Sequence, residues 1–397
     1  MRALVVVVLL VACSKNEERR AEPEAAGSGS APAPAPIDAA PPPSAIEGVP
    51  VAIVVPEPVT IVQEVVMDAE RVYVIGRDIA VWSRSAIVAS AGGGAPKVLV
   101  DVEVDESTGK GAVNASNEQE VARMAAGDPD VARAANAMRS VTTYEYAKHY
   151  SEGAVHGGYL YLSNMGTEAR GRKDATVERL SVAGGPVEVL AKEVPGGVAD
   201  LMVDDAGVWI ITHTNAIMKM PHAGGAVTMV WEPPAVTDEA SYEIAMGGDS
   251  FFVAESTLDK EFAHKNARIT RVPKAGGAKA KVIVPRLPSS VNDLVADGTS
   301  LYWFDGKQTG VYRVDHAGTQ KPKLLVKGYG EKMRVFGKHL FRIVKDKDKN
   351  EEYLARSPIG GGVEERLHEL PKHTSIASVD EAAVWLVNEG YILRYAL

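Results

Sequence analysis

The 397-residue sequence contains one cysteine, only 6% aromatic residues and no block of basic residues. One cysteine excludes an internal disulfide and any metal site built from several thiolates. Because the formal net charge is −9 and the basic residues are scattered, a protein that holds nucleic acid through phosphate contacts is not expected. The longest apolar run, residues 3–13, is too short to span a bilayer as a mature helix, which excludes a polytopic membrane protein.

The chain is instead rich in turn-forming residues, with 37 glycines and 23 prolines. With 46% hydrophobic residues, it is long enough to bury one large core or two ordinary ones. Many turns in a chain of this length favour an architecture of many short β-strands over a bundle of helices.

The first residues have the pattern of a bacterial export signal, a short basic start followed by the apolar run. Leu10-Val11-Ala12-Cys13 resembles the lipobox of bacterial lipoproteins, in which small residues precede a cysteine. The resemblance implies that residues 1–12 are a signal peptide, that Cys13 is lipidated, and that the lipid anchors the chain in the cell envelope. Ser14 resembles a sorting signal for the outer membrane, on its periplasmic side or at the cell surface. A signal peptide that ends near an unrelated cysteine is the alternative.

Residues 13–47 continue with a composition rich in Ala, Pro, Gly and Ser, including Pro41-Pro42-Pro43. Such a composition favours extended polyproline geometry and has too few apolar side chains for a core. We therefore predict a tether that displays a folded domain of residues 48–397.

From Gly48 the chain repeats a unit of about 40–50 residues, a period typical of propellers. Its clearest feature is a triplet of aliphatic, aromatic and aliphatic residues, usually preceded by a turn with Asp or Gly. The seven copies, some of them imperfect, are Val72-Tyr73-Val74, Leu160-Tyr161-Leu162, Val208-Trp209-Ile210, Phe251-Phe252-Val253, Leu301-Tyr302-Trp303, Leu340-Phe341-Arg342 and Val384-Trp385-Leu386. Each unit predicts four strands, but the last unit stops at its third. Because Gly48–Val54 resembles Gly184–Leu190, we expect the N-terminal segment to supply the missing strand.

These units predict an all-β fold, a seven-bladed β-propeller of four-stranded antiparallel blades closed by the N-terminal strand, with six or eight blades as alternatives. Tyr302-Trp303-Phe304-Asp305 resembles the Tyr-Trp-Thr-Asp repeat of one propeller group. The Gly-Gly turns resemble those of TolB-like propellers of bacterial lipoproteins. The resemblance implies the architecture and carries over no catalytic residue.

The connections of such a propeller divide between two faces. The turns between first and second strands, and between third and fourth strands, lie on what we name the turn face; all other connections lie on the loop face. Only the loop face carries long insertions, at residues 104–147, 164–175, 255–267 and 345–352. Because binding residues concentrate on loops held by a rigid scaffold, we expect the loop face to be functional.

The insertion at residues 104–147 predicts a small helical hairpin. Ser116–Gln119 has the pattern of a capping box, and Asp128-Pro129 that of a second helix start. Its narrow apolar stripes favour docking on the propeller rim, with a lid or a partner-binding helix as alternatives.

Polar residues follow most triplets at the expected mouth of the central channel. They are the candidate ligand-binding residues Asn164, Thr212, Glu255, Asp305 and Asn388. Strand ends that enter solvent loops are polar in any case, which is the simpler explanation.

A second weak candidate is a metal site at Asp346, Asp348 and Asn350, which have the alternating oxygen ligands that open a calcium loop. Glu351 stands where that loop needs a glycine, so a solvated charged loop is the favoured interpretation. No cofactor is predicted, and calcium is the single exception considered. The nine histidines have no spacing that fixes a metal geometry, and no nucleophile or phosphate-loop motif occurs, so no catalytic residue is predicted.

The sequence favours a membrane-tethered, extracytoplasmic scaffold that binds a protein, a peptide or an envelope polymer without catalysis. Charges of both signs in the loop-face insertions, such as Arg172 and Asp259, suit the polar rim of a binding surface. A metal-assisted hydrolase or lyase acting in the channel is one alternative. A component of an envelope-assembly complex is the other.

Overall fold

The computed structural model describes residues 51–54, 61–68, 71–77, 84–91, 97–103, 150–164, 175–234, 240–258, 264–277, 279–307, 309–328, 330–346, 349–388 and 391–397. Residues 45–397 belong to one compact unit, and residues 1–44 to another. The predicted signal peptide, Cys13, the tether and the insertion at 104–147 lie outside the described residues. Within the described part, no helix is long and apolar enough to cross a membrane.

Six blades are each formed by four consecutive antiparallel strands. Blade 1 contains β2 (Ile61–Met67), β3 (Arg71–Arg77), β4 (Arg84–Ala91) and β5 (Lys97–Glu103). Blade 2 contains β6 (Tyr150–His156), β7 (Tyr159–Asn164), β8 (Thr176–Ser181) and β9 (Glu188–Ala191). Blade 3 contains β10 (Asp200–Asp204), β11 (Gly207–Ile211), β12 (Ile217–Met220) and β13 (Thr228–Trp231). Blade 4 contains β14 (Ala240–Gly247), β15 (Ser250–Leu258), β16 (His264–Pro273) and β17 (Lys281–Val284). Blade 5 contains β18 (Val291–Ala296), β19 (Ser300–Asp305), β20 (Gly310–Asp315) and β21 (Lys323–Lys327). Blade 6 contains β22 (Gly330–Phe336), β23 (His339–Asp346), β24 (Glu351–Pro358) and β25 (Glu365–Leu370).

A seventh four-stranded sheet, here named the closing sheet, joins the two ends of the described chain. It contains β26 (Ser375–Val379), β27 (Ala383–Asn388), β28 (Tyr391–Ala396) and β1 (Val51–Val54). β1 runs antiparallel to β28, with Val51 opposite Arg394 and Val54 opposite Tyr391. The N-terminal strand therefore completes the last sheet, as its resemblance to an outer strand suggested.

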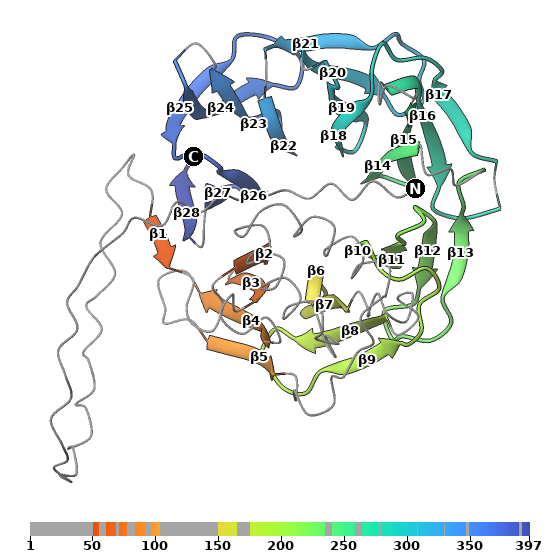
Figure 1. The fold of residues 1–397 in the computed structure, drawn as a ribbon, viewed down its shortest axis with the longest axis vertical. Coiled ribbons are helices and arrows are strands. Elements are labelled where there is room, and N and C mark those ends of the chain that lie inside the picture. The colour runs from red at the N-terminus through yellow and green to blue at the C-terminus, as the bar shows by residue number, and fades with distance from the viewer. Residues whose placement is uncertain are drawn as a thin grey trace, which may run out of the picture. The chain divides into compact units, whose positions relative to one another are not determined.

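The sheets stand around a central axis, with the first strand of each innermost (Figure 1). Around this ring, β2 contacts β6, β6 contacts β10, β14 contacts β18, β18 contacts β22, β22 contacts β26, and β26 contacts β2. Blades 3 and 4 share a hydrophobic cluster in which the rings of Trp209 and Phe251 are 5.1 Å apart. The ring of sheets is closed, and the fold is a β-propeller.

The triplets form the second strand of each sheet, and their side chains pack between adjacent sheets. Val208, Trp209 and Ile210 are all fully buried. A strand that is covered on both faces reads as a continuous apolar run instead of an alternating one, which is why the triplets stand out in the sequence.

The predicted fold class, a seven-bladed propeller with a helical insertion, needs correction. Only six blades consist of consecutive strands, because the remaining sheet is assembled from both ends of the chain. Every regular element in the described residues is a strand, so the predicted helical insertion has no support.

Two predicted loop-face insertions are also wrong. Residues 255–267 are largely strand, because β15 continues to Leu258 and β16 begins at His264. Residues 345–346 and 351–352 belong to the paired strands of an ordinary hairpin, in which Asp346 pairs with Glu351. Polar residues in long hairpins lack the apolar pattern that marks a strand in the sequence, so they resemble a loop.

Candidate functional site

Four of the five predicted ligand-binding residues lie at or just after the end of the second strand in their sheets, namely Asn164, Thr212, Asp305 and Asn388. Glu255 lies within the second strand of blade 4, β15, which continues to Leu258. The Asp305 carboxylate accepts hydrogen bonds from Thr309, at 2.6 Å from its N–H and 2.8 Å from its hydroxyl. Glu255 forms an ion pair with Arg268 on the adjacent strand, with Nη2 2.8 Å from Oε2. These contacts fix the hairpins in which the residues stand.

Thr212, Asn388 and Asn164 are also held by the structure around them. The Thr212 hydroxyl lies 2.9 Å from that of Thr214 in its own hairpin. Asn388 Nδ2 donates to Lys372 O at 2.6 Å, and Asn164 is buried with 4% of its surface exposed. Because the second strand is separated from the axis by the first strand, the structure does not gather these residues around one point.

The predicted calcium ligands are also engaged locally. Asp346 accepts a hydrogen bond from Lys349 N at 3.2 Å, and Asn350 Oδ1 accepts one from Lys372 Nζ at 3.0 Å. Asp348 lies outside the described residues. In the part of the chain that the structure describes, no group of three or more His, Cys, Asp or Glu side chains could hold a metal ion.

A different set of residues converges at the centre. The position nine residues before the central aromatic of each triplet is charged in six of the seven sheets. We name these residues the axial ring: Glu64, Glu152, Asp200, Glu243, Asp293 and Lys332. All six stand on the innermost strands, and Ile376 occupies the position in the closing sheet.

The ring lies toward the loop face. Each first strand runs from the loop face to the turn face, and the ring residues stand in its first half, such as Asp200 at the start of β10. Burial raises the pKa of the Asp200 carboxyl, while the N–H of Leu201 and the charge of Arg334 oppose this shift. Because Arg334 comes from blade 6, three sheets away from blade 3, both side chains must reach toward the axis.

Glu64 and Glu152 form a hydrogen-bonded carboxyl pair across the seam between blades 1 and 2. Glu64 Oε2 also accepts a hydrogen bond from Gly153 N at 2.5 Å. Burial, reinforced by the charge of Glu152, raises the pKa of Glu64 to about 9. Burial and the charge of Asp200 raise the pKa of Glu152 to about 7. The pair therefore holds a proton at neutral pH.

The opposite side of the ring repeats this arrangement with added positive charge. Asp293 accepts a hydrogen bond from Met333 N on β22, the seam contact that Glu64 makes with Gly153. Burial first, and then the charge of Asp293, raises the pKa of Glu243 to about 7, while Lys332 acts against the shift. The ring thus combines protonated carboxyl groups, carboxylates and an ammonium group, which can recognise a ligand with both hydrogen-bonding and charged groups.

The sequence analysis missed the ring, although a signal was present. An acidic residue stands nine positions before Tyr73, Tyr161, Trp209, Phe252 and Tyr302. Comparing the residues before the triplets, instead of those after them, identifies the axial ring.

The turn face carries a second repeated contact. An aspartate five residues before the central aromatic accepts a hydrogen bond from its polar tip, at 2.6 Å in Asp68–Tyr73, 2.8 Å in Asp204–Trp209, 2.6 Å in Asp297–Tyr302 and 2.8 Å in Asp380–Trp385. Each aspartate also accepts backbone N–H groups of its own turn. These contacts tie the turns to the core and explain the Asp-containing turns that precede the triplets.

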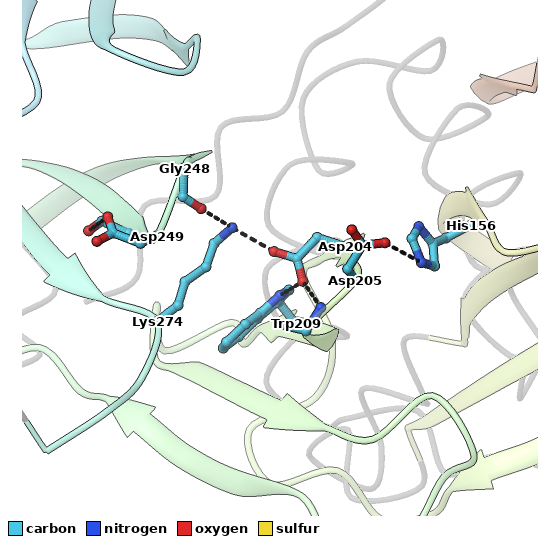
Figure 2. Close-up of polar contacts among 9 residues, drawn as sticks. His156, Asp204, Asp205, Trp209, Gly248, Asp249 and Lys274 are labelled. Atoms are coloured by element: carbon cyan, nitrogen blue, oxygen red, sulfur yellow. Dashed lines mark hydrogen bonds and ion pairs between the residues drawn. The ribbon is translucent and has the colours of Figure 1, made fainter.

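The contact in blade 3 extends to blade 4 (Figure 2). Lys274 Nζ donates to Asp204 Oδ2 at 2.6 Å and to Gly248 O at 2.7 Å, and only 11% of its side chain is exposed. Burial alone would raise the pKa of Asp204, but hydrogen bonds from Lys274, Trp209 and Ala206 together hold it below its ordinary value. Asp204 therefore remains ionised and joins the two blades.

We expect Asp204→Ala to lower the free energy of unfolding by about 2–3 kcal/mol, because it leaves a buried ammonium and an indole N–H without their acceptor. Urea denaturation at pH 7 measures the loss. The adjacent Asp205, whose side chain is fully exposed, provides the matched control. Equal effects of Asp204→Ala and Asp205→Ala would contradict the assigned role.

No protein-family model matches the sequence, and no curated protein is significantly similar to it. Among solved structures, YCF48 bound to the D1 peptide is 9% identical, with a TM-score of 0.55 over 89% of this chain and 99% of that one. A putative TolB from Agrobacterium tumefaciens is 15% identical, with a TM-score of 0.38 over 56% of this chain and 82% of that one. An oligogalacturonate lyase in complex with manganese is 13% identical, with a TM-score of 0.45 over 59% of this chain and 72% of that one. At these identities the likeness concerns the fold alone, and it places the chain among β-propellers without assigning a family.

Proposed function

We propose that this protein is a tethered, non-catalytic binding scaffold that recognises a protein, a peptide or an envelope polymer at the loop-face end of its axis. The observation that supports this most directly is the convergence of charged side chains from six blades on the axial ring. Ring positions on a closed propeller are held by rigid strands, so a ligand would meet preorganised groups. The structure of YCF48 bound to the D1 peptide illustrates that a similar fold can hold a peptide.

The membrane anchor is part of the proposal and rests on the sequence. The lipobox-like Leu10–Cys13 supports lipidation, and the proline-rich residues 13–47 support a tether in the envelope, at the outer membrane. The proposed partners in the envelope include the subunits of an envelope-assembly complex.

A hydrolase or lyase acting at the same ring is the second candidate, favoured by the Glu64–Glu152 pair. A carboxyl group with a pKa of about 7, such as that of Glu152, is suited to general acid–base work near neutral pH. Perturbed carboxyls also occur in purely structural clusters, and Glu64 already holds a seam between blades.

Photo-cross-linking in cells tests the scaffold proposal. A photoreactive amino acid placed at Lys332, which is exposed on the ring, should capture a partner in the membrane fraction. The same group at Asp249, whose exposed side chain lies on the turn face, should not. Capture only from Asp249, or from neither position in folded protein, would refute recognition at the axial mouth. Capture of a small metabolite that the protein converts would favour the enzyme.

A further inference from the structure

The seam between blades 2 and 3 departs from the aspartate–aromatic contact of the turn face. His156 occupies the position five residues before Tyr161, where the equivalent turns have Asp68 or Asp204. The Tyr161 hydroxyl instead lies 3.1 Å from Nδ1 of His222, which follows β12 in blade 3. Two imidazoles have thus replaced one carboxylate at this seam.

The two imidazoles stack on each other, with ring centroids 5.0 Å apart and planes inclined by 10°. His156 Nε2 points toward Asp205, 3.4 Å from Oδ1 (Figure 2). His222 Nε2 is buried and has no hydrogen-bond partner among the described residues. Protonation of both ring nitrogens would place a charged N–H against the protein interior without an acceptor.

His222 belongs to a turn that binds blade 2 through its backbone as well. Arg179 Nη1 donates to His222 O at 2.9 Å, and Gly225 N donates to Leu190 O at 3.2 Å. The approach is close, because a Cβ on Gly224 would lie 2.8 Å from Leu190 O. Any movement of the His222 side chain therefore acts on a turn that is in direct contact with the neighbouring blade.

The charged groups around the pair are Arg179, Glu188 and Asp205. Arg179 stands over the Tyr159 ring, 4.4 Å from its centroid, and pairs with Glu188 at 2.7 Å. Asp205 lies beside His156, but its side chain is fully exposed and therefore well screened. None of these carboxylates is an acceptor for His222 Nε2.

We propose that the stacked His156–His222 pair is an acid-sensitive latch between blades 2 and 3. In the closed form, the turn at residues 221–225 packs on blade 2 and covers His222 Nε2. In acid, the open turn exposes His222 to water and takes up a proton that the closed turn excludes, so protonation shifts the population toward the open form. Imidazole is the side chain whose ordinary titration falls in the range between neutral and mildly acidic surroundings.

Amide hydrogen exchange of the full chain at pH 7.5 and pH 5.0, corrected for intrinsic exchange rates, tests the latch. The Gly225 amide reports seam opening, because its acceptor is in the other blade. We expect its protection to fall by about tenfold at pH 5.0, against a limit of roughly 30-fold for one excluded proton on an ordinary imidazole. Unchanged protection in the wild-type protein would overturn the proposal.

Two variants and one control distinguish the latch from a general effect of acid. His222→Val introduces the residue found at the equivalent Val182, and His156→Asp restores a carboxylate beside Tyr161. His222→Val should make Gly225 protection the same at both pH values within about twofold, and His156→Asp should reduce the change. His373→Asn removes an exposed imidazole from a positive-φ position elsewhere and should leave the acid response of Gly225 protection intact. A full acid response in His222→Val would also overturn the proposal, and the wild-type result stands even if a variant does not fold.

Discussion

Arg342→Met is expected to lower the free energy of unfolding by about 4 kcal/mol, the largest effect of any single substitution considered for this protein. The Arg342 side chain in blade 6 is 1% exposed and binds Glu364 through Nε at 2.7 Å and Nη2 at 2.9 Å. It also donates to the carbonyl oxygens of Lys327 and Gly328 in the neighbouring blade, both at 3.1 Å. Methionine fills much of the space but leaves the carboxylate and both carbonyls without this donor. Urea denaturation at pH 7 measures the change.

The matched control is Arg366→Met, which removes an arginine from the surface of the same blade. Arg366 is 40% exposed and pairs with Glu351 at 3.2 Å and Glu369 at 3.7 Å. Surface ion pairs of this kind contribute at most about 1 kcal/mol. The double variant Arg342→Met/Glu364→Gln should recover part of the loss, because it removes the partly buried carboxylate that has lost its arginine. Equal costs for Arg342→Met and Arg366→Met would show that the contacts of Arg342 with the Lys327 and Gly328 carbonyls do not stabilise the packing of blades 5 and 6.

The second large expected effect is a loss of stability as the pH rises from acidic to alkaline. Folding raises the pKa of Glu64 from 4.5 to about 9, and those of Glu152 and Glu243 to about 7. The folded state therefore retains protons that the unfolded state releases above pH 4.5, and stability is lost as the pH rises through the folded-state pKa values. The expected slope is about 1.4 kcal/mol per pH unit for each retained proton. Urea denaturation in steps from pH 5 to pH 9 measures it.

Amide variants of the ring separate this effect from other titrations. Glu152→Gln and Glu243→Gln keep the shape of the side chain but cannot ionise, so they should flatten the profile and raise stability at pH 8. Glu365→Gln, at an exposed surface ion pair, should leave the slope unchanged. A wild-type profile that is flat from pH 5 to pH 9 would show that the axial carboxyls are solvated like ordinary surface groups.

The sequence predicted the strands of the propeller well where both faces are covered. Leu301, Tyr302 and Trp303 are buried from both sides, and such apolar runs recur with the period of the sheets. The turns were equally clear, since Asp297 and Asp380 cap them in a way that aspartate chemistry dictates.

The axial ring was missed in the sequence for a physical reason. Asp305 caps its own hairpin, and Asn388 binds the segment before β26. Such structural polar residues look like binding residues when only the sequence is read. Glu64 and Asp293 act across seams, and their partners Gly153 and Met333 are distant in sequence. The seam contacts depend on how neighbouring sheets twist and pack, which no local pattern encodes.

The closing sheet also governs the order in which the protein can fold. The six blades consist of neighbouring strands, so their contacts are local and can form rapidly as each segment becomes available. β1 can pair only after β28, the last described strand, is available. This pairing has a large entropic cost, because it closes nearly the whole domain into one loop. Ring closure is therefore expected to be the slow, rate-limiting step of folding. Until it occurs, the outer edge of β28 is open to pairing with β1 of another molecule, which makes strand exchange the characteristic misfolding route of this architecture.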